Sequence, residues 1–117
     1  MKILIVGASG FLGRKLFNDL LTDEHDVVGS SRIKRGFLKL DITDHENLKL
    51  VLEQGNFDTA INLAAVGVTA GTSNEQEMVQ VNSDATIHFA RILSNLQNPP
   101  TLIHIASSTE PIGNVQP

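Results

Sequence analysis

Residues 3–13 read Ile-Leu-Ile-Val-Gly-Ala-Ser-Gly-Phe-Leu-Gly, and this stretch decides the fold. Its first four residues are apolar without alternation, which is typical of a central parallel strand that is covered on both faces. Glycines then predict a tight turn out of the strand. The apolar spacing after the turn predicts an amphipathic helix over residues 11–21. The stretch therefore predicts a strand, a glycine turn and a helix in immediate succession.

Each glycine of this turn has a separate task if the turn holds a dinucleotide. Gly7 permits the sharp turn, Gly10 lets the backbone approach a pyrophosphate, and Gly13 lets the helix pack closely against the sheet. Amide groups in the first helical turn would face the phosphates, and the helix dipole adds to the attraction. The spacing is G-x-x-G-x-x-G, so an ordinary strand-to-helix turn is the alternative interpretation. The candidate cofactor-binding residues of the turn are Gly7, Ser9, Gly10, Phe11, Leu12 and Gly13.

The rest of the chain continues the alternation of strands and helices. Further strands are predicted over residues 26–30, 37–40, 59–63 and 101–106, and further helices over residues 44–54 and 74–97. Thr43 and Glu46 predict a capping box at the first of these helices, and Gly55 is predicted to cap its end. Strands that alternate with helices require parallel crossovers of one hand. We therefore predict one α/β domain, a doubly wound Rossmann-type parallel sheet with strand order 3-2-1-4-5.

Composition limits the classes of protein to consider. The chain has 117 residues, a net charge of −4 and no cysteine. This charge gives no general attraction to nucleic acid or to acidic membranes, and no apolar stretch approaches the roughly 20 residues of a membrane span. Met1 and Lys2 lead directly into the first strand, so we expect no signal peptide. The lack of cysteine is compatible with a cytoplasmic protein without excluding other locations.

The end of the second strand is predicted to select the cofactor. In dinucleotide folds, an acidic residue about 20 residues after the glycines binds the ribose hydroxyls. Here Ser31 and Arg32 occupy that place, and Lys34 and Arg35 follow. An arginine suits a 2′-phosphate, because its fork donates two parallel hydrogen bonds to phosphate oxygens. Ser31 and Arg32 therefore favour NADP over NAD, and a solvated basic loop is the structural alternative.

Asp41 and Ile42 follow the predicted third strand. In one interpretation Asp41 accepts from the adenine amino group while Ile42 packs on the ring. In the other, Asp41 and Asp44 only supply negative charge to the start of the next helix, where it is favoured.

Several separated stretches together resemble one family. They are residues 7–13, Asp41-Ile42-Thr43-Asp44, Asn62-Leu63-Ala64-Ala65, Val81-Asn82 and Ile105-Ala106-Ser107-Ser108. In this order they resemble the extended short-chain dehydrogenase/reductases, and within them the nucleotide-sugar epimerases, dehydratases and reductases. The resemblance extends over nearly the whole chain, and it corresponds to only the N-terminal portion of a family member.

The resemblance implies roles for further residues. Leu63, Ala64 and Ala65 would line the pyrophosphate and the ribose on the nicotinamide side. Asn82 resembles a helix asparagine near the family's active site. Counting back from Gly113, Ser108 rather than Ser107 would bind the substrate's keto oxygen.

The chain also departs from the family pattern. The family's proton donor is a tyrosine with a lysine four residues later, but this chain has no tyrosine and its last lysine is Lys49. Ile112 stands where the family has the tyrosine of a Tyr-Gly pair. The four histidines show no metal-ligand spacing, so no metal site is predicted.

Two hypotheses about function follow. The first is that residues 1–117 are the NADP(H)-binding portion of an enzyme that acts at a keto carbon of a nucleotide-linked sugar. The resemblance then implies that the chain ends before the Tyr-x-x-x-Lys helix and the substrate lobe, and the chain alone is expected to be inactive. The alternative is a stand-alone NADP(H)-binding or redox-sensing module without catalysis. A Tyr-x-x-x-Lys motif encoded downstream would favour the enzyme.

Overall fold

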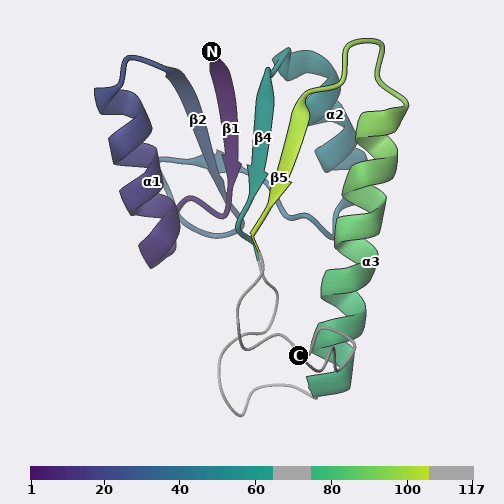
Figure 1. Ribbon diagram of the computed structural model, residues 1–117. Helices are drawn as coiled ribbons and strands as arrows, with labels where there is room; N and C mark the ends of the chain where they lie inside the picture. The colour runs from purple at the N-terminus through teal and green to yellow at the C-terminus, as the bar shows by residue number, and fades with distance from the viewer. Residues whose placement is uncertain (65–74, 106–117) are drawn as a thin grey trace, which may run out of the picture.

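A computed structural model describes residues 1–64 and 75–105 as a layered α/β structure (Figure 1). Its elements are β1 (Lys2–Val6), α1 (Phe11–Thr22), β2 (Asp26–Ser31), β3 (Leu38–Lys39), α2 (His45–Gly55), β4 (Thr59–Asn62), α3 (Glu75–Ser94) and β5 (Thr101–His104). All neighbouring strands are parallel, in the order β3-β2-β1-β4-β5. The doubly wound sheet and its strand order are confirmed.

β1 lies at the centre of the sheet because both of its faces are apolar. Ile3 and Ile5 lie on one face and Leu4 and Val6 on the other, and none of the four is more than 4% exposed. The strand pairs with β2 on one side and with β4 on the other. Such complete burial of a continuous apolar run is what a parallel sheet covered on both faces requires.

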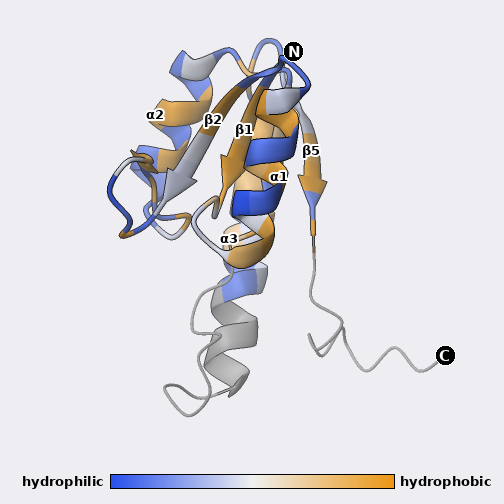
Figure 2. Ribbon diagram, turned by 90° about the vertical axis from the view of Figure 1, so that its left-hand side faces the viewer, coloured by the Kyte–Doolittle hydropathy of each residue, from blue (hydrophilic) through white to orange (hydrophobic). Residues whose placement is uncertain are grey.

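Helices cover the two faces of the sheet unequally. α2 and α3 pack on the face that carries Leu4 and Val6, where Leu48, Leu52 and Phe89 are almost fully buried. α1 covers the opposite face through a set of partly buried side chains, Leu16, Phe17 and Leu20. Figure 2 views the molecule from the α1 side, and the hydrophilic residues of α1 are turned away from the strands.

β5 forms an edge of the sheet whose α1-side face is open among the described residues. Ile103 is 44% exposed and Ile105 is 42% exposed. In Figure 2, β5 is strongly hydrophobic and no described helix lies in front of it. Leu102, on the other face, packs against the core. No helix in the described part of the chain is both long and apolar enough to cross a membrane.

Both predicted caps of α2 are wrong. Asp44 is the N-cap, and its carboxylate accepts from the Asn47 amide. The Thr43 hydroxyl instead donates to Asp41 Oδ1 at 2.7 Å, so it is not available for a capping box. At the other end, Asn56 adopts the left-handed conformation with φ of 50°, which asparagine tolerates better than most residues. Gly55 lies inside the helix, where a Cβ would overlap the Phe57 ring.

Other predicted bounds shift by a few residues. β3 has only two residues instead of the predicted 37–40. Phe37, just before it, packs edge-to-face on Phe17 with ring centroids 6.0 Å apart. Leu12 and Leu21 are 50% and 46% exposed, so they lie outside the buried stripe of α1. β5 ends at His104 rather than at Ala106, which lies outside the described residues.

Two histidines stack where α2 meets α3. The rings of His45 and His88 are 3.6 Å apart between centroids and are inclined by 18°. Burial, the neighbouring His45 and the Arg91 guanidinium all hold the pKa of His88 below its ordinary value. A proton on His88 is therefore less favourable in the folded chain than in the unfolded chain.

The lowered pKa predicts that the fold loses stability in mild acid. The unfolded chain binds the proton more readily, so the contribution of His88 is present above the ordinary imidazole pKa and is lost as the pH falls through the lowered value. Urea unfolding at pH 7.5 and pH 5.5 measures the loss, which we expect His88→Gln to reduce. His25→Gln, in the turn before β2, is the control and should leave the loss unchanged. An equal loss in His88→Gln and in the original chain would contradict this account.

Candidate functional site

The glycine turn lies at the carboxyl-terminal edge of the sheet, between the ends of β2 and β4. The amides of Gly7 and Ala8 both donate to the carbonyl of Ser30, at 3.1 and 2.8 Å. On the other side, the Leu63 amide donates to the carbonyl of Val6. β1 is the strand at which the order of the sheet reverses, and in open parallel sheets ligands bind in the crevice at this point.

The three glycines of the turn are required for different reasons. Gly7 has φ of +86°, and a Cβ there would lie 2.9 Å from the Ala64 amide nitrogen. A Cβ on Gly13 would overlap the Gly7 carbonyl oxygen and lie 2.8 Å from the Ala8 Cα. A Cβ on Gly10 would meet nothing closer than 3.9 Å. The described part of the protein therefore explains why residues 7 and 13 are glycine, but it does not explain the glycine at position 10.

The N-terminus of α1 opens onto the same edge. Its N-cap is Gly10, which makes no side-chain capping bond, and the first turn holds no acidic residue. The first amides of a helix have no partner within the helix, so here they are available to an external acceptor. Phe11 beside them is 92% exposed. A helix terminus of this kind attracts anions through its amides and its dipole.

Ser31 builds the loop at the end of β2. Its side chain is buried, and its hydroxyl oxygen accepts from the amides of Ile33 and Lys34 at 3.4 and 3.0 Å. The same oxygen lies 2.9 Å from Ser9 Oγ, so a pair of hydroxyls joins the glycine turn to the basic loop. The sequence-predicted residues Ser9 and Ser31 are thus brought together, but the hydroxyl of Ser31 is occupied by protein groups.

Arg32 and Asp41 follow the ends of the neighbouring strands β2 and β3. Arg32 is exposed, and Asp41 is half-buried. Burial alone would raise the pKa of the Asp41 carboxyl, but hydrogen bonds from the Thr43 hydroxyl and amide, with the Arg32 charge nearby, leave that pKa below its ordinary value. Asp41 is therefore an ionised acceptor at neutral pH. Ile42 next to it is only 3% exposed and belongs to the core.

The end of β4 supplies the remaining described candidates. Leu63 and Ala64 are half-buried and continue directly from the strand. Asn82 lies on α3, whose first turns extend beyond the carboxyl ends of the strands in Figure 1. Its carbonyl accepts from the Thr86 hydroxyl. The predicted site residues Ala65 and Ser108 lie outside the described residues, as does Gly113, from which Ser108 was counted.

Two residues at this edge were missed as individual site candidates. Asn62 ends β4 with only 1% of its surface exposed, and His104 ends β5 directly beside it. Asn62 Nδ2 lies 3.4 Å from His104 Nδ1, and Asn62 Oδ1 accepts from the Ala64 amide at 3.0 Å. A carboxamide at the end of an otherwise apolar strand was the signal in the sequence, because a buried amide requires hydrogen-bond partners.

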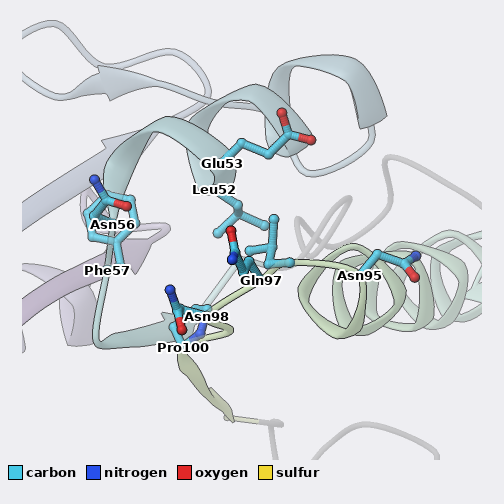
Figure 3. Close-up of a pocket in the computed structure, with 9 residues that line it drawn as sticks. Leu52, Glu53, Asn56, Phe57, Asn95, Gln97, Asn98 and Pro100 are labelled. Carbon is cyan, nitrogen blue, oxygen red and sulfur yellow. The ribbon is translucent and has the colours of Figure 1, made fainter.

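A separate pocket lies at the opposite edge of the sheet, before β4 and β5 begin (Figure 3). Its volume is about 350 Å³. Four carboxamide side chains line it, together with Glu53 and a few apolar side chains; the carboxamides belong to Asn56, Asn95, Gln97 and Asn98. Because the glycine turn is at the other ends of the strands, this pocket is not part of the site. No group of three or more metal-ligating side chains occurs within residues 1–64 and 75–105.

Comparison with known proteins gives a consistent family. The family described as "NAD dependent epimerase/dehydratase family" matches residues 3–117. Among curated proteins, the chain is similar to the dTDP-6-deoxy-L-talose 4-dehydrogenase (NAD(P)(+)) of Kitasatospora kifunensis. The two are 27% identical over 127 residues, which cover 98% of this chain and 39% of that protein.

Solved structures share the fold. A hypothetical dTDP-4-dehydrorhamnose reductase from Sulfolobus tokodaii superimposes with a TM-score of 0.71 and 31% identity, over 91% of this chain and 39% of that one. The L-threonine dehydrogenase of Clostridium difficile gives a TM-score of 0.74 and 28% identity, over 91% of this chain and 36% of that one. The chain thus spans less than half the length of each of these relatives.

Proposed function

Because this chain belongs to the NAD dependent epimerase/dehydratase family, we propose that residues 1–117 form the NADP(H)-binding portion of an enzyme that acts on a nucleotide-linked sugar at a keto carbon. The family consists of nicotinamide-dependent dehydrogenases, epimerases and dehydratases, so the general class of cofactor follows from membership. The preference for NADP, the sugar substrate and the roles of single residues are our proposal. The Kitasatospora relative, named for a dTDP-sugar and for NAD(P)(+), supports the class of substrate and the nicotinamide cofactor, but not the choice between NADP and NAD.

One observation carries the proposal: position 10 is a glycine that nothing in the described protein requires. Its φ of −74° is accessible to any residue, and the space beside it is open. The uncapped first turn of α1 borders the same space. A pyrophosphate placed there would account for both features, because it needs a close backbone approach and amide donors.

The rest of the cofactor would extend along the same edge of the sheet. The adenine amino group would donate to the ionised Asp41 carboxylate, and the 2′-phosphate would meet the exposed Arg32. Ser31 would act by holding the turn that presents Arg32, since its own hydroxyl already bonds Ser9 and two loop amides. Leu63, Ala64 and Ala65 would line the ribose on the nicotinamide side.

The proposed chemistry needs a bound hydride carrier and a proton donor. The described residues are suited to binding the hydride carrier, but they do not include the tyrosine that would donate the proton. When bound, the nicotinamide supplies hydride transfer. The chain's own residues hold the dinucleotide by its phosphates, orient it by its adenine and ribose, and would present the Ser108 hydroxyl to the keto oxygen. The sequence has no tyrosine to protonate the alkoxide that then develops. The relatives are more than twice as long as this chain. We propose that the proton donor and the sugar site are supplied by sequence that corresponds to the part of the relatives that this chain does not match.

Gly10→Val tests the central observation. The added side chain would occupy the space proposed for the pyrophosphate, so we expect titration with NADPH to show no binding. Its effect on the free energy of unfolding should stay within about 1 kcal/mol, because a lost N-cap preference and a less flexible unfolded chain oppose each other. Gly13→Ala is the matched comparison for stability. Its Cβ would overlap the Gly7 carbonyl, so we expect this variant, unlike Gly10→Val, to lose about 1–3 kcal/mol of folding free energy. Normal NADPH binding by Gly10→Val would show that the glycine serves only the turn.

Arg32→Asp tests the choice of cofactor. We expect the original chain to bind NADPH more tightly than NADH and the variant to reverse that order. Loss of a charge-assisted phosphate contact costs about 1.5–3 kcal/mol, or about 10- to 150-fold in affinity. Lys49→Asp, on the exposed side of α2, changes the net charge equally and should preserve the preference. Identical titration curves for the two cofactors with the original chain would rule out this assignment.

The 117-residue chain alone should bind NADPH without oxidising it. General acid assistance is worth about 10²–10⁴-fold, and loss of substrate positioning removes more, so turnover with any sugar nucleotide should fall below detection. NADPH binding should still stabilise the fold. At an NADPH concentration of a hundred times Kd, the free energy of unfolding should rise by about 2.7 kcal/mol, which appears as a higher melting temperature. Measurable NADPH oxidation by the purified chain would mean that another of its residues supplies the proton.

A further inference from the structure

We propose that Asn62 and His104 are positioning residues for the cofactor, and that the hydrogen bond between their side chains sets the backbone at Ala64 only while His104 is neutral. This inference rests on the proposed function, because it concerns the same cofactor. It adds two residues to the site and makes cofactor affinity depend on a protonation state.

The orientation of the Asn62 amide follows from its neighbours. The Ala64 backbone amide can only donate, so the atom 3.0 Å from it must be the acceptor, Oδ1. The Nδ2 group then faces His104 Nδ1 at 3.4 Å. Because Nδ2 can only donate, Nδ1 of His104 must accept. That requires a neutral imidazole with its proton on Nε2.

Protonation of His104 would break this arrangement. An imidazolium donates from both nitrogens, so two donors would face each other across the 3.4 Å between Asn62 and His104. Asn62 is only 1% exposed, and a buried amide that loses its partner is costly. The side chain of His104 is exposed, so protons reach it from solvent.

The hydrogen bond between the Asn62 and His104 side chains, here called the bridge, acts on the glycine turn through Ala64. The Ala64 amide nitrogen would lie 2.9 Å from a Cβ on Gly7, so the two backbones are packed without space between them. The main chain of Asn62 is also held, since its carbonyl accepts from the Ile105 amide. A rotated Asn62 amide would release the Ala64 amide and loosen the contact between the end of β4 and the turn. In the proposed complex this corner faces the pyrophosphate and the nicotinamide-side ribose.

Few other charged groups lie on the surrounding elements. His104 is the only titratable residue within β4 and β5, and Asp58 precedes β4 at the opposite ends of the strands, where it accepts from the Lys2 amide. On α3, the described titratable side chains are Asp84, His88 and Arg91. The 2′-phosphate of the cofactor also titrates in mild acid. The test therefore compares variants with one cofactor rather than relying on a single pH profile.

The experiment measures NADP⁺ affinity by calorimetry at pH 8.0 and pH 5.5 for the 117-residue chain and for two variants. Neutral hydrogen bonds have modest net strength, so we expect the original chain to lose about three- to tenfold more affinity in acid than His104→Gln. Glutamine carries no titrating group, so the acid dependence that remains in this variant should be that of the cofactor 2′-phosphate. His88→Gln is the matched control and should keep the pH dependence of the original chain.

Nuclear magnetic resonance of the cofactor-free chain reads the bridge directly. We expect His104 as the Nε2–H tautomer at pH 8.0, and exchange of the Ala64 amide should accelerate as His104 becomes protonated. An Nδ1–H tautomer, or equal pH dependence of NADP⁺ affinity in the original chain and His104→Gln, would overturn the inference. Absence of NADP⁺ binding at pH 8.0 would overturn the proposed function and this inference with it. The tautomer and exchange data would then still show whether the bridge exists.

Discussion

The approach of three backbone segments around Gly7 is the constraint on which the rest of the structure depends. β1 leaves the sheet there, α1 begins, and the end of β4 passes alongside. A side chain on Gly7 would meet the Ala64 amide, and one on Gly13 would meet the Gly7 carbonyl. Because neither position carries a Cβ, the helix can start within one short turn of the central strand. Its amide terminus is thereby placed at the carboxyl edge of the sheet.

Buried polar side chains frame the same point. Among the described residues, the buried polar ones are Ser30, Ser31 and Asn62, and all three stand at the carboxyl ends of strands that flank β1. Each has a hydrogen-bond partner in the described structure, so none carries the full cost of an unsatisfied group. Ser31 joins β2 to the glycine turn through Ser9, and Asn62 joins β4 to β5 through His104. The polar groups of the interior are therefore concentrated where the edge of the sheet must be held in a fixed shape.

Membership of the epimerase/dehydratase family agrees with this distribution. The features proposed to bind the dinucleotide all lie at one edge, whereas the amide-rich pocket lies at the other and shares none of them. The face of β5 on the α1 side carries exposed Ile103, and in the described part no helix covers it. The sheet is thus well packed around β1 and only partly covered at β5.

The sequence by itself determined the elements and their order. Continuous apolar runs, helical spacing and glycine placement are local signals, and the handedness of parallel crossovers converts alternating elements into the strand order that was found. The sequence also identified Gly7 and Gly13, because their spacing reflects a packing requirement within a few residues of chain.

Only the tertiary structure decided which polar groups meet. Thr43 was expected to cap α2, but it bonds Asp41, since a nearby carboxylate competes with the helix amides. Ser31 was predicted as a cofactor-binding residue, and only the structure shows that its hydroxyl supports the loop and meets Ser9, 22 residues earlier. Asn62 and His104, 42 residues apart, become neighbours only because β4 and β5 pair in register. Hydrogen bonds between side chains that are distant in the sequence depend on strand pairing and burial. The sequence around one partner does not reveal either of these, so it does not identify the other partner.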